Sequence, residues 1–205
     1  MKKKITAIAL VICLVAVAVV GGSLAYFTDK ADATNTFTVG NVDITLTEPN
    51  WKSTGSQDAP EVYPGEPLAK DPTVENTGAN PCFVRIKVTG LDQFGNKGNI
   101  VYLTKWVEGA LGEGWVLHTD GYFYWTKPLV VKGTENDSWN NGLASKTTPL
   151  FDQIKMPTGL TGGEEAKPIV VTAEAVQAQG ARPSWSAVQT MTVAEIAAWF
   201  TTCGM

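Results

Sequence analysis

The clearest alternation of apolar and polar positions in the chain covers residues 82–89. One set of alternate positions is apolar and the other is mixed: Cys82, Val84, Ile86 and Val88 against Phe83, Arg85, Lys87 and Thr89. A period of two places successive side chains on opposite faces of an extended chain, so this segment is predicted to be a strand. We expect Arg85 and Lys87 to face solvent there.

Similar patterns predict further strands at residues 36–47, 100–107, 114–118, 122–131, 148–156 and 167–177. In the first of these, Gly40 and Asn41 shift the alternation by one position, which indicates a bulge or a kink. Clusters of Pro, Gly, Ser and Asp predict a loop over residues 49–67 that ends in a turn, and a second turn lies at residues 75–81.

Short strands separated by turns, without regular alternation of strand and helix, favour an antiparallel fold. One helix is predicted near the end of the chain, because Thr192 and Glu195 have the spacing of a capping box. The apolar residues Ile196, Ala197, Trp199 and Phe200 follow this box. We therefore predict a mainly β protein, an antiparallel jelly roll or β-sandwich with a short C-terminal helix, forming a single domain over residues 26–205.

The first 25 residues have the order of a secretory signal. Three lysines are followed by an apolar run over residues 5–20 and by small residues at 21–25. Ser23 and Ala25 have the spacing that a signal peptidase reads, so cleavage is expected after Ala25, with Tyr26 as a near alternative. An uncleaved anchor is the other interpretation, since residues 5–27 are long enough to span a bilayer. A lipid-modified Cys13 is disfavoured by the bulky Ile12 before it.

Removal of residues 1–25 takes away three lysines and no acidic residue. It leaves 13 basic and 20 acidic residues, so the net charge changes from −4 to −7. Nucleic-acid binding needs a basic surface, and this balance argues against it. Cys82 and Cys203 remain after the cut, and an oxidising exterior would permit a disulfide between them. The alternative is that Cys82 is a small buried apolar residue.

The sequence lacks the common catalytic motifs. Its one histidine, His118, rules out the H-E-x-x-H motif of zinc proteases, and no G-x-S-x-G motif is present. His118 lies in a hairpin rich in Trp and Tyr, where we expect a structural role. Asparagines and aspartates at residues 92–99 and 136–137 lack EF-hand spacing, and Glu164 with Glu165 lies in a Gly-rich loop. We predict no enzyme activity, no metal and no cofactor, although a separated pair of glycosidase acids stays open.

Aromatic residues are concentrated between residues 106 and 139. Trp106, Trp115, Trp125 and Trp139 lie close in sequence to Tyr122, Phe123 and Tyr124. Such residues can stack on sugars or line an interface, and Trp115 with Trp125 is the candidate aromatic surface. The alternative is that they fill the core of the sandwich.

The residues around the predicted cleavage site also resemble those of a known family. Residues 21–29 (GGSLAYFTD) and 33–42 (ATNTFTVGNV) are similar to the export junction of the TasA and camelysin (CalY) family of Gram-positive bacteria. Residues 70–78, 83–88 and 169–178 resemble core strands of the same family, whereas residues 90–163 show no such likeness. The resemblance therefore covers about half of the chain.

The resemblance implies a jelly-roll protein that is cut by a signal peptidase of the SipW type and assembles into fibres of the biofilm matrix. In that scheme the N-terminal segment pairs as an extra strand with the next subunit. The candidate donor strand lies within residues 26–40 and includes Phe27, Thr28, Asp29, Thr36, Phe37 and Val39.

The implied partners are the SipW-type peptidase and other copies or related matrix subunits, with membrane contact only during export. The protein is expected in the extracellular matrix or at the cell surface. Camelysins are classed as metalloproteases, but this sequence lacks their expected zinc motif. A cell-surface module for carbohydrate binding or adhesion is the alternative function.

Overall fold

The computed structural model describes residues 41–58, 62–161 and 166–205. The predicted signal segment with Ser23, Ala25 and Tyr26 lies outside the described residues, as does the candidate donor strand over residues 26–40. Glu164 and Glu165 lie outside them too.

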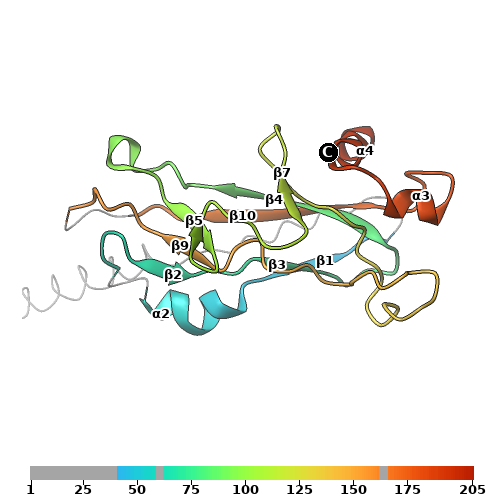
Figure 1. The fold of residues 1–205 in the computed structure, drawn as a ribbon, viewed down its shortest axis with the longest axis horizontal. Helices are drawn as coiled ribbons and strands as arrows, with labels where there is room; N and C mark the ends of the chain where they lie inside the picture. The colour runs from blue at the N-terminus through green and yellow to red at the C-terminus, as the bar shows by residue number, and fades with distance from the viewer. Residues whose placement is uncertain (1–40, 59–61, 162–165) are drawn as a thin grey trace, which may run out of the picture.

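The described chain folds mainly into antiparallel β-structure, which confirms the predicted fold class (Figure 1). One four-stranded sheet has the order β10 (Val170–Gln177), β4 (Cys82–Thr89), β8 (Phe123–Trp125), β7 (Trp115–Leu117). The other has the order β2 (Pro67–Ala69), β9 (Gln153–Lys155), β5 (Val101–Thr104), β6 (Val107–Glu108). A separate two-stranded sheet joins β1 (Ile44–Thr47) to β3 (Thr73–Asn76).

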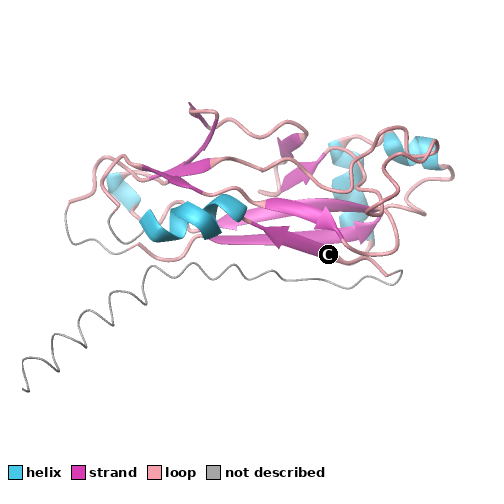
Figure 2. Cartoon of the chain, turned by 90° about the horizontal axis from the view of Figure 1, so that it is seen from below, coloured by secondary structure: helices cyan, strands magenta, loops and turns pink. Residues whose placement is uncertain are grey.

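The longest strand pair joins β4 to β10, and it runs from Val170 opposite Thr89 to Gln177 opposite Cys82. The two strands lie side by side along the length of the molecule (Figure 2). The strand predicted at residues 82–89 is confirmed at both ends. The alternation of residue types in β4 arises because the two faces of this strand contact different parts of the fold.

One face of this sheet packs against the second sheet. Ile86 of β4, Phe123 of β8 and Ile154 of β9 belong to the same buried cluster. The ring of Tyr102 lies 5.7 Å from that of Phe151 and 5.9 Å from that of Phe123, measured between centroids. Side chains from both sheets thus share one core, as in a β-sandwich.

The opposite face of the same sheet packs against two C-terminal helices, α3 (Trp185–Gln189) and α4 (Val193–Thr202). Phe83 and Tyr124 from the sheet form a second buried cluster with Ile196 and Phe200 of α4. The predicted capping box of α4 is confirmed, because the Thr192 side chain accepts from the Glu195 amide and the Glu195 side chain accepts from the Thr192 amide.

The prediction of a loop over residues 49–67 needs correction. A π-helical segment η1 (Trp51–Gly55) continues into the helical turn α2 (Ser56–Asp58), and β2 begins at Pro67. The cause is a distant side chain: Asp71 Oδ1 accepts from the Asn50 amide at 2.9 Å and holds the start of η1. The turn predicted before Pro67 is confirmed by a bond of 3.0 Å from the Glu66 amide to the Tyr63 carbonyl.

Other strands are shorter than predicted. The first begins at Ile44 within the described residues, after Asn41 with a φ of 60°. The strand predicted at residues 100–107 is the hairpin β5–β6, and a short 3₁₀ segment η3 (Gly95–Lys97) precedes it. Within the ranges that the structure describes, no helix has the length and apolar character needed to cross a membrane.

Candidate functional site

Arg85 lies on the helix-covered face of β4 and is 6% exposed, so the prediction that it faces solvent is wrong. Its Nε donates to Glu174 Oε2 at 2.7 Å, and its Nη2 lies 2.6 Å from the same oxygen. Its Nη1 donates to the hydroxyl of Tyr124 at 3.1 Å. Lys87, two residues further on, is exposed as predicted.

Aromatic rings complete the surroundings of the Arg85 guanidinium. Its Cζ lies 3.9 Å from the ring centroid of Tyr122 and 4.4 Å from that of Phe200 in α4. A guanidinium is delocalised and weakly hydrated, so it gives up water for contacts with aromatic rings and a carboxylate at a lower cost than a lysine ammonium does. Arg85 therefore joins the sheet to the C-terminal helix.

The polar network continues from Arg85 to His118. The Tyr124 hydroxyl donates to Asp120 Oδ2 at 2.8 Å, and Asp120 Oδ1 lies 3.2 Å from His118 Nδ1. Burial and the bond to Asp120 raise the pKa of Tyr124 to about 12, against the lowering effect of Arg85. His118 also packs edge-on against the Tyr124 ring. These contacts are those of a structural histidine.

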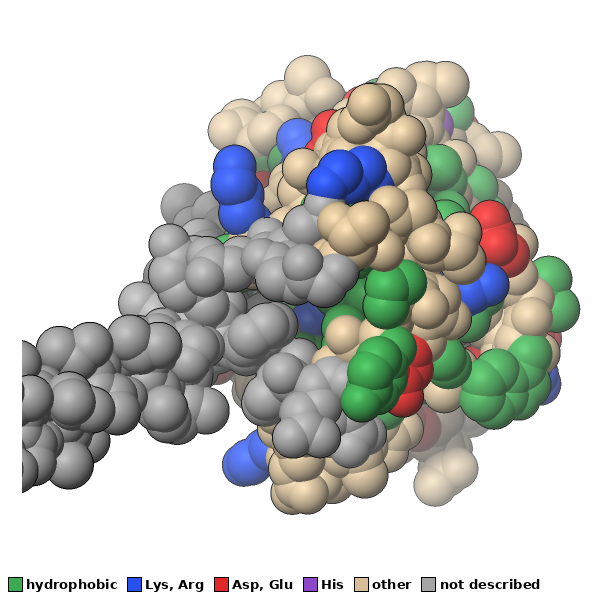
Figure 3. Space-filling model, turned by 90° about the vertical axis from the view of Figure 1, so that its left-hand side faces the viewer, with side chains coloured by type: hydrophobic (Ala, Val, Ile, Leu, Met, Phe, Trp, Pro, Cys, Tyr) green, Lys and Arg blue, Asp and Glu red, His purple; other side chains and the backbone are tan. Residues whose placement is uncertain are grey.

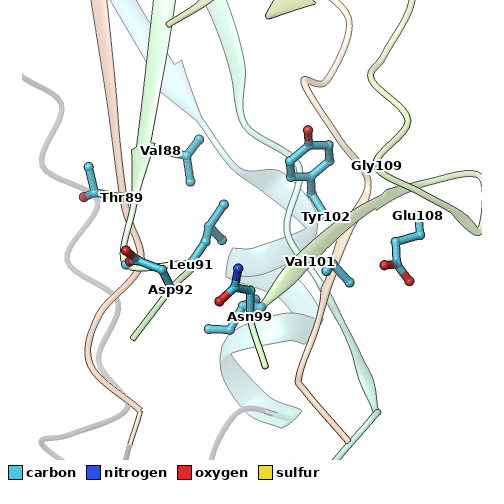
Figure 4. A pocket seen from close by; sticks show the side chains of 11 residues that line it. Val88, Thr89, Leu91, Asp92, Asn99, Val101, Tyr102, Glu108 and Gly109 are labelled. Atoms are coloured by element: carbon cyan, nitrogen blue, oxygen red, sulfur yellow. The ribbon is translucent and has the colours of Figure 1, made fainter. Parts of the chain in front are cut away.

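An open groove of about 540 Å³ lies between the end of β4 and the β5–β6 hairpin (Figure 4). Its lining is partly apolar, with Leu91 and Tyr102, and partly polar, with Asp92, Asn99 and Glu108. The left-hand end of the molecule in Figure 1 carries basic, acidic and hydrophobic side chains on one face (Figure 3). Over the described parts of the chain, no three His, Cys, Asp or Glu residues come together as a metal site would require.

The candidate aromatic surface is not a surface in the structure. Trp115 is 5% exposed and packs edge-on against the half-buried Trp125, with ring centroids 5.4 Å apart. Its Nε1 donates to the Thr148 carbonyl at 2.9 Å, so its one polar atom is used inside the fold. This pair follows the alternative that the tryptophans fill the core.

The exposed tryptophans are elsewhere. Trp106 is 73% exposed at the tip of the β5–β6 hairpin, where Lys105 and Trp106 have φ values of 49° and 69°. Trp139 is 48% exposed and contacts Trp185 at the N-terminus of α3, a residue that sequence reasoning did not single out. Ser184 just before Trp185 caps α3, and this local signal could have placed the tryptophan at a helix start.

Cys82 and Cys203 are both free thiols, so the disulfide does not form in this structure. Cys82 is fully buried in the sandwich core, whereas Cys203 packs against the cluster under α4. Burial raises the pKa of both thiols. Cys82 thus follows the alternative interpretation, that of a small buried apolar residue.

Residues 1–89 match a protein family described as camelysin metallo-endopeptidase. The match ends at Thr89, the last residue of β4, so it includes β1, β2, β3 and β4 but none of the later strands. No curated protein and no solved structure matched the chain.

The family description names a metallo-endopeptidase, which hints at a catalytic metal. His118 lies beyond the matched residues, and its imidazole contacts Asp120 and the ring of Tyr124. Among the described residues, no third His, Cys, Asp or Glu joins this pair, so the three protein ligands of a catalytic zinc centre are not assembled there.

Proposed function

We propose that this protein is an exported structural subunit of an extracellular biofilm matrix, because its residues 1–89 match the camelysin family and its export junction resembles that of TasA and camelysin proteins. The family match over residues 1–89 is the observation that carries this proposal, and it supports a secreted protein of the matrix type. Beyond the family match, we propose three further points: cleavage near Ala25, assembly into fibres, and a role without catalysis.

In the proposed mechanism, the segment at residues 26–40 leaves its own domain after the signal is cut and pairs as a strand with the next subunit. Main-chain hydrogen bonds would supply affinity, and Phe37 and Val39 would anchor the strand in the neighbour. A head-to-tail contact of this kind does not close on itself, so it propagates a filament. Partners are other copies or related matrix subunits, together with a SipW-type peptidase.

The first experiment tests cleavage. Mass spectrometry of the protein secreted by its native host should give a mature N-terminus at or next to residue 26. A chain that keeps residues 1–25 and stays in the membrane fraction would instead show the uncleaved anchor. That result would remove the release of the donor strand from the mechanism.

The second experiment tests assembly. Mature protein that starts at residue 26 should form filaments visible by electron microscopy and sediment as polymers, alone or with related matrix subunits. Phe37→Asp should abolish assembly, because it puts a charge at the proposed anchor. Ala198→Asp is the matched control, since Ala198 is exposed on the helix α4 and not on an edge strand to which another strand could be added. A wild-type protein that stays monomeric at high concentration, or a Phe37→Asp variant that assembles normally, contradicts the proposal.

The alternative, a carbohydrate-binding module built on Trp115 and Trp125, loses its support at those residues because Trp115 is buried and its Nε1 is bonded within the fold.

A further inference from the structure

Two tryptophans far apart in sequence meet at one end of the sandwich. The rings of Trp139 and Trp185 lie 5.9 Å apart between centroids at an interplanar angle of 62°. Trp139 comes from the loop after β8, and Trp185 begins α3 at the right-hand end of Figure 1. The loops at the end of a sandwich are a usual location for binding sites, because the sheets hold them in place.

Hydrogen bonds fix this pair in position. Trp185 Nε1 donates to the Trp139 carbonyl at 3.0 Å, and Gln189 Nε2 donates to the same oxygen at 3.1 Å. Trp139 nevertheless stays 48% exposed, so much of its ring remains available to a ligand. A ring that is ordered before binding loses little conformational entropy when a ligand arrives.

Polar groups lie beside Trp185, the member of the pair that is half-buried against the cluster under α4. A hollow of about 200 Å³ beside Trp185 is lined in part by Gln179, Arg182 and Ser184. Gln179 and Arg182 are exposed, and the Arg182 guanidinium is held by an ion pair with Glu195 of α4. The hollow therefore combines one aromatic wall with a planar amide, a planar guanidinium and a hydroxyl, which together donate and accept hydrogen bonds.

We propose that this end of the protein binds neutral pyranose rings of a polysaccharide, with Trp185 and Trp139 as stacking surfaces. A pyranose presents apolar C–H groups on its faces and hydroxyl groups around its edge. An aromatic ring can cover the face while Gln179, Arg182 and Ser184 bind the hydroxyls. A protein partner would favour an apolar pocket, whereas this hollow is lined by several polar side chains.

This binding site is separate from the proposed assembly strand and adds a second activity to it. A subunit that binds sugar as well as its own neighbours would connect protein filaments to the polysaccharide around them. Binding through many subunits of one filament would also gain strength from multivalency.

The test uses the chain from residue 26 carrying Phe37→Asp, so that binding is measured on monomers and does not depend on assembly. The probes are a broad glycan array, followed by calorimetric titration with the tetramer of N-acetylglucosamine and with cellotetraose. Trp185→Ala and Trp139→Ala should each weaken binding by about tenfold or more, the loss expected for one stacked ring. Gln179→Ala should weaken binding by a smaller factor.

Trp106→Ala is the matched control, because Trp106 is the most exposed tryptophan that the structure describes and lies on the β5–β6 hairpin. It should leave binding unchanged. Gln179→Ala is the variant least expected to misfold, because removing this exposed side chain leaves no cavity in the core. The thermal unfolding midpoint of this variant is measured to verify that it is folded. Silence on the array and with both tetrasaccharides overturns the proposal. Equal losses for Trp106→Ala and Trp185→Ala overturn it as well.

Discussion

The two faces of the sheet that contains β4 are both buried over residues 82–86, but they are built differently. The face toward the second sheet carries Cys82, Val84 and Ile86 in an apolar core. The face toward α4 carries Phe83 and Arg85, and it combines aromatic packing with an ion pair to Glu174. One face therefore depends on shape and burial alone, and the other also depends on charges and hydroxyl groups that must stay paired.

This difference shows how much structure can be inferred from an alternation of apolar and polar residues. Alternation of residue types separates two faces, but it does not say whether the face with a charge meets water or a helix. A charge can be buried when a carboxylate and aromatic rings surround it, as Glu174, Tyr122 and Phe200 surround Arg85. Four substitutions test this contrast, and they follow from the largest expected effect to the smallest.

Phe151→Ala removes a fully buried ring from the sandwich core, where it stacks on Tyr102. We expect the free energy of unfolding to fall by about 3–5 kcal/mol, the usual effect of a large cavity. Urea unfolding followed by circular dichroism measures it. Trp106→Ala, on the exposed hairpin, should change stability by less than about 0.5 kcal/mol. Similar losses for the two variants would mean that the sandwich core does not dominate stability.

Phe200→Ala makes the same change on the helix-covered face, where the ring is fully buried. We expect a loss of about 3 kcal/mol, at the lower end of the usual range, because the helix can partly close the cavity. Amide hydrogen exchange should accelerate first in α4 and later in β5 and β9, since elements of low local stability open separately. Uniform acceleration through both sheets would show instead that the helical cap and the sandwich unfold as one unit.

Thr192→Ala removes the hydroxyl that accepts from the Glu195 amide at the start of α4. The expected loss is about 1 kcal/mol, typical of an N-cap. Thermal or urea unfolding measures it against Thr202→Ala, whose hydroxyl donates to the Ala198 carbonyl in the last turn of the same helix. An equal effect of the two variants would show that the capping box contributes nothing particular to the helical face.

Asp120→Asn tests the polar network through its pH dependence. Partial burial acts to raise the pKa of Asp120, but hydrogen bonds from the Tyr122 amide and the Tyr124 hydroxyl and the interaction with His118 outweigh it, so this pKa is lowered. The stability that this carboxylate contributes is therefore present above its unfolded pKa of about 3.9 and is lost as the pH falls through the folded pKa.

Urea midpoints measured at steps from pH 7 to pH 3 should accordingly fall less steeply for Asp120→Asn than for the wild type. Parallel pH curves would show that Asp120 has the same pKa in the folded and unfolded chains.

Local signals account for the parts of the fold that the sequence predicts well. The strand at residues 82–89 follows from its own alternation, and the start of α4 follows from two residues of a capping box. Burial of Arg85, by contrast, depends on Glu174 and Phe200, which lie far along the chain. The helical segment η1 likewise depends on Asp71, about twenty residues away.

The candidate binding site was harder to predict for the same reason. Trp139 and Trp185 are 46 residues apart, and only the packing of α3 beside the loop after β8 brings them together. Trp115 and Trp125 looked equally suitable as a surface, because both lie in the same aromatic segment. Trp115 is buried with its Nε1 donating to the Thr148 carbonyl, and Thr148 lies 33 residues further along the chain.

The pairing of β4 with β10 also sets the order in which the chain can fold. Residues 82–89 can pair with β8 earlier, but their longest pairing must wait for residues 170–177, and the loop between Thr89 and Val170 spans about two-fifths of the chain. Contacts of such long range form slowly, because the entropy of loop closure is lost before the strand bonds are gained. A chain that leaves a ribosome or a translocation pore from its N-terminus therefore keeps β4 without its longest partner strand until residue 177 has emerged.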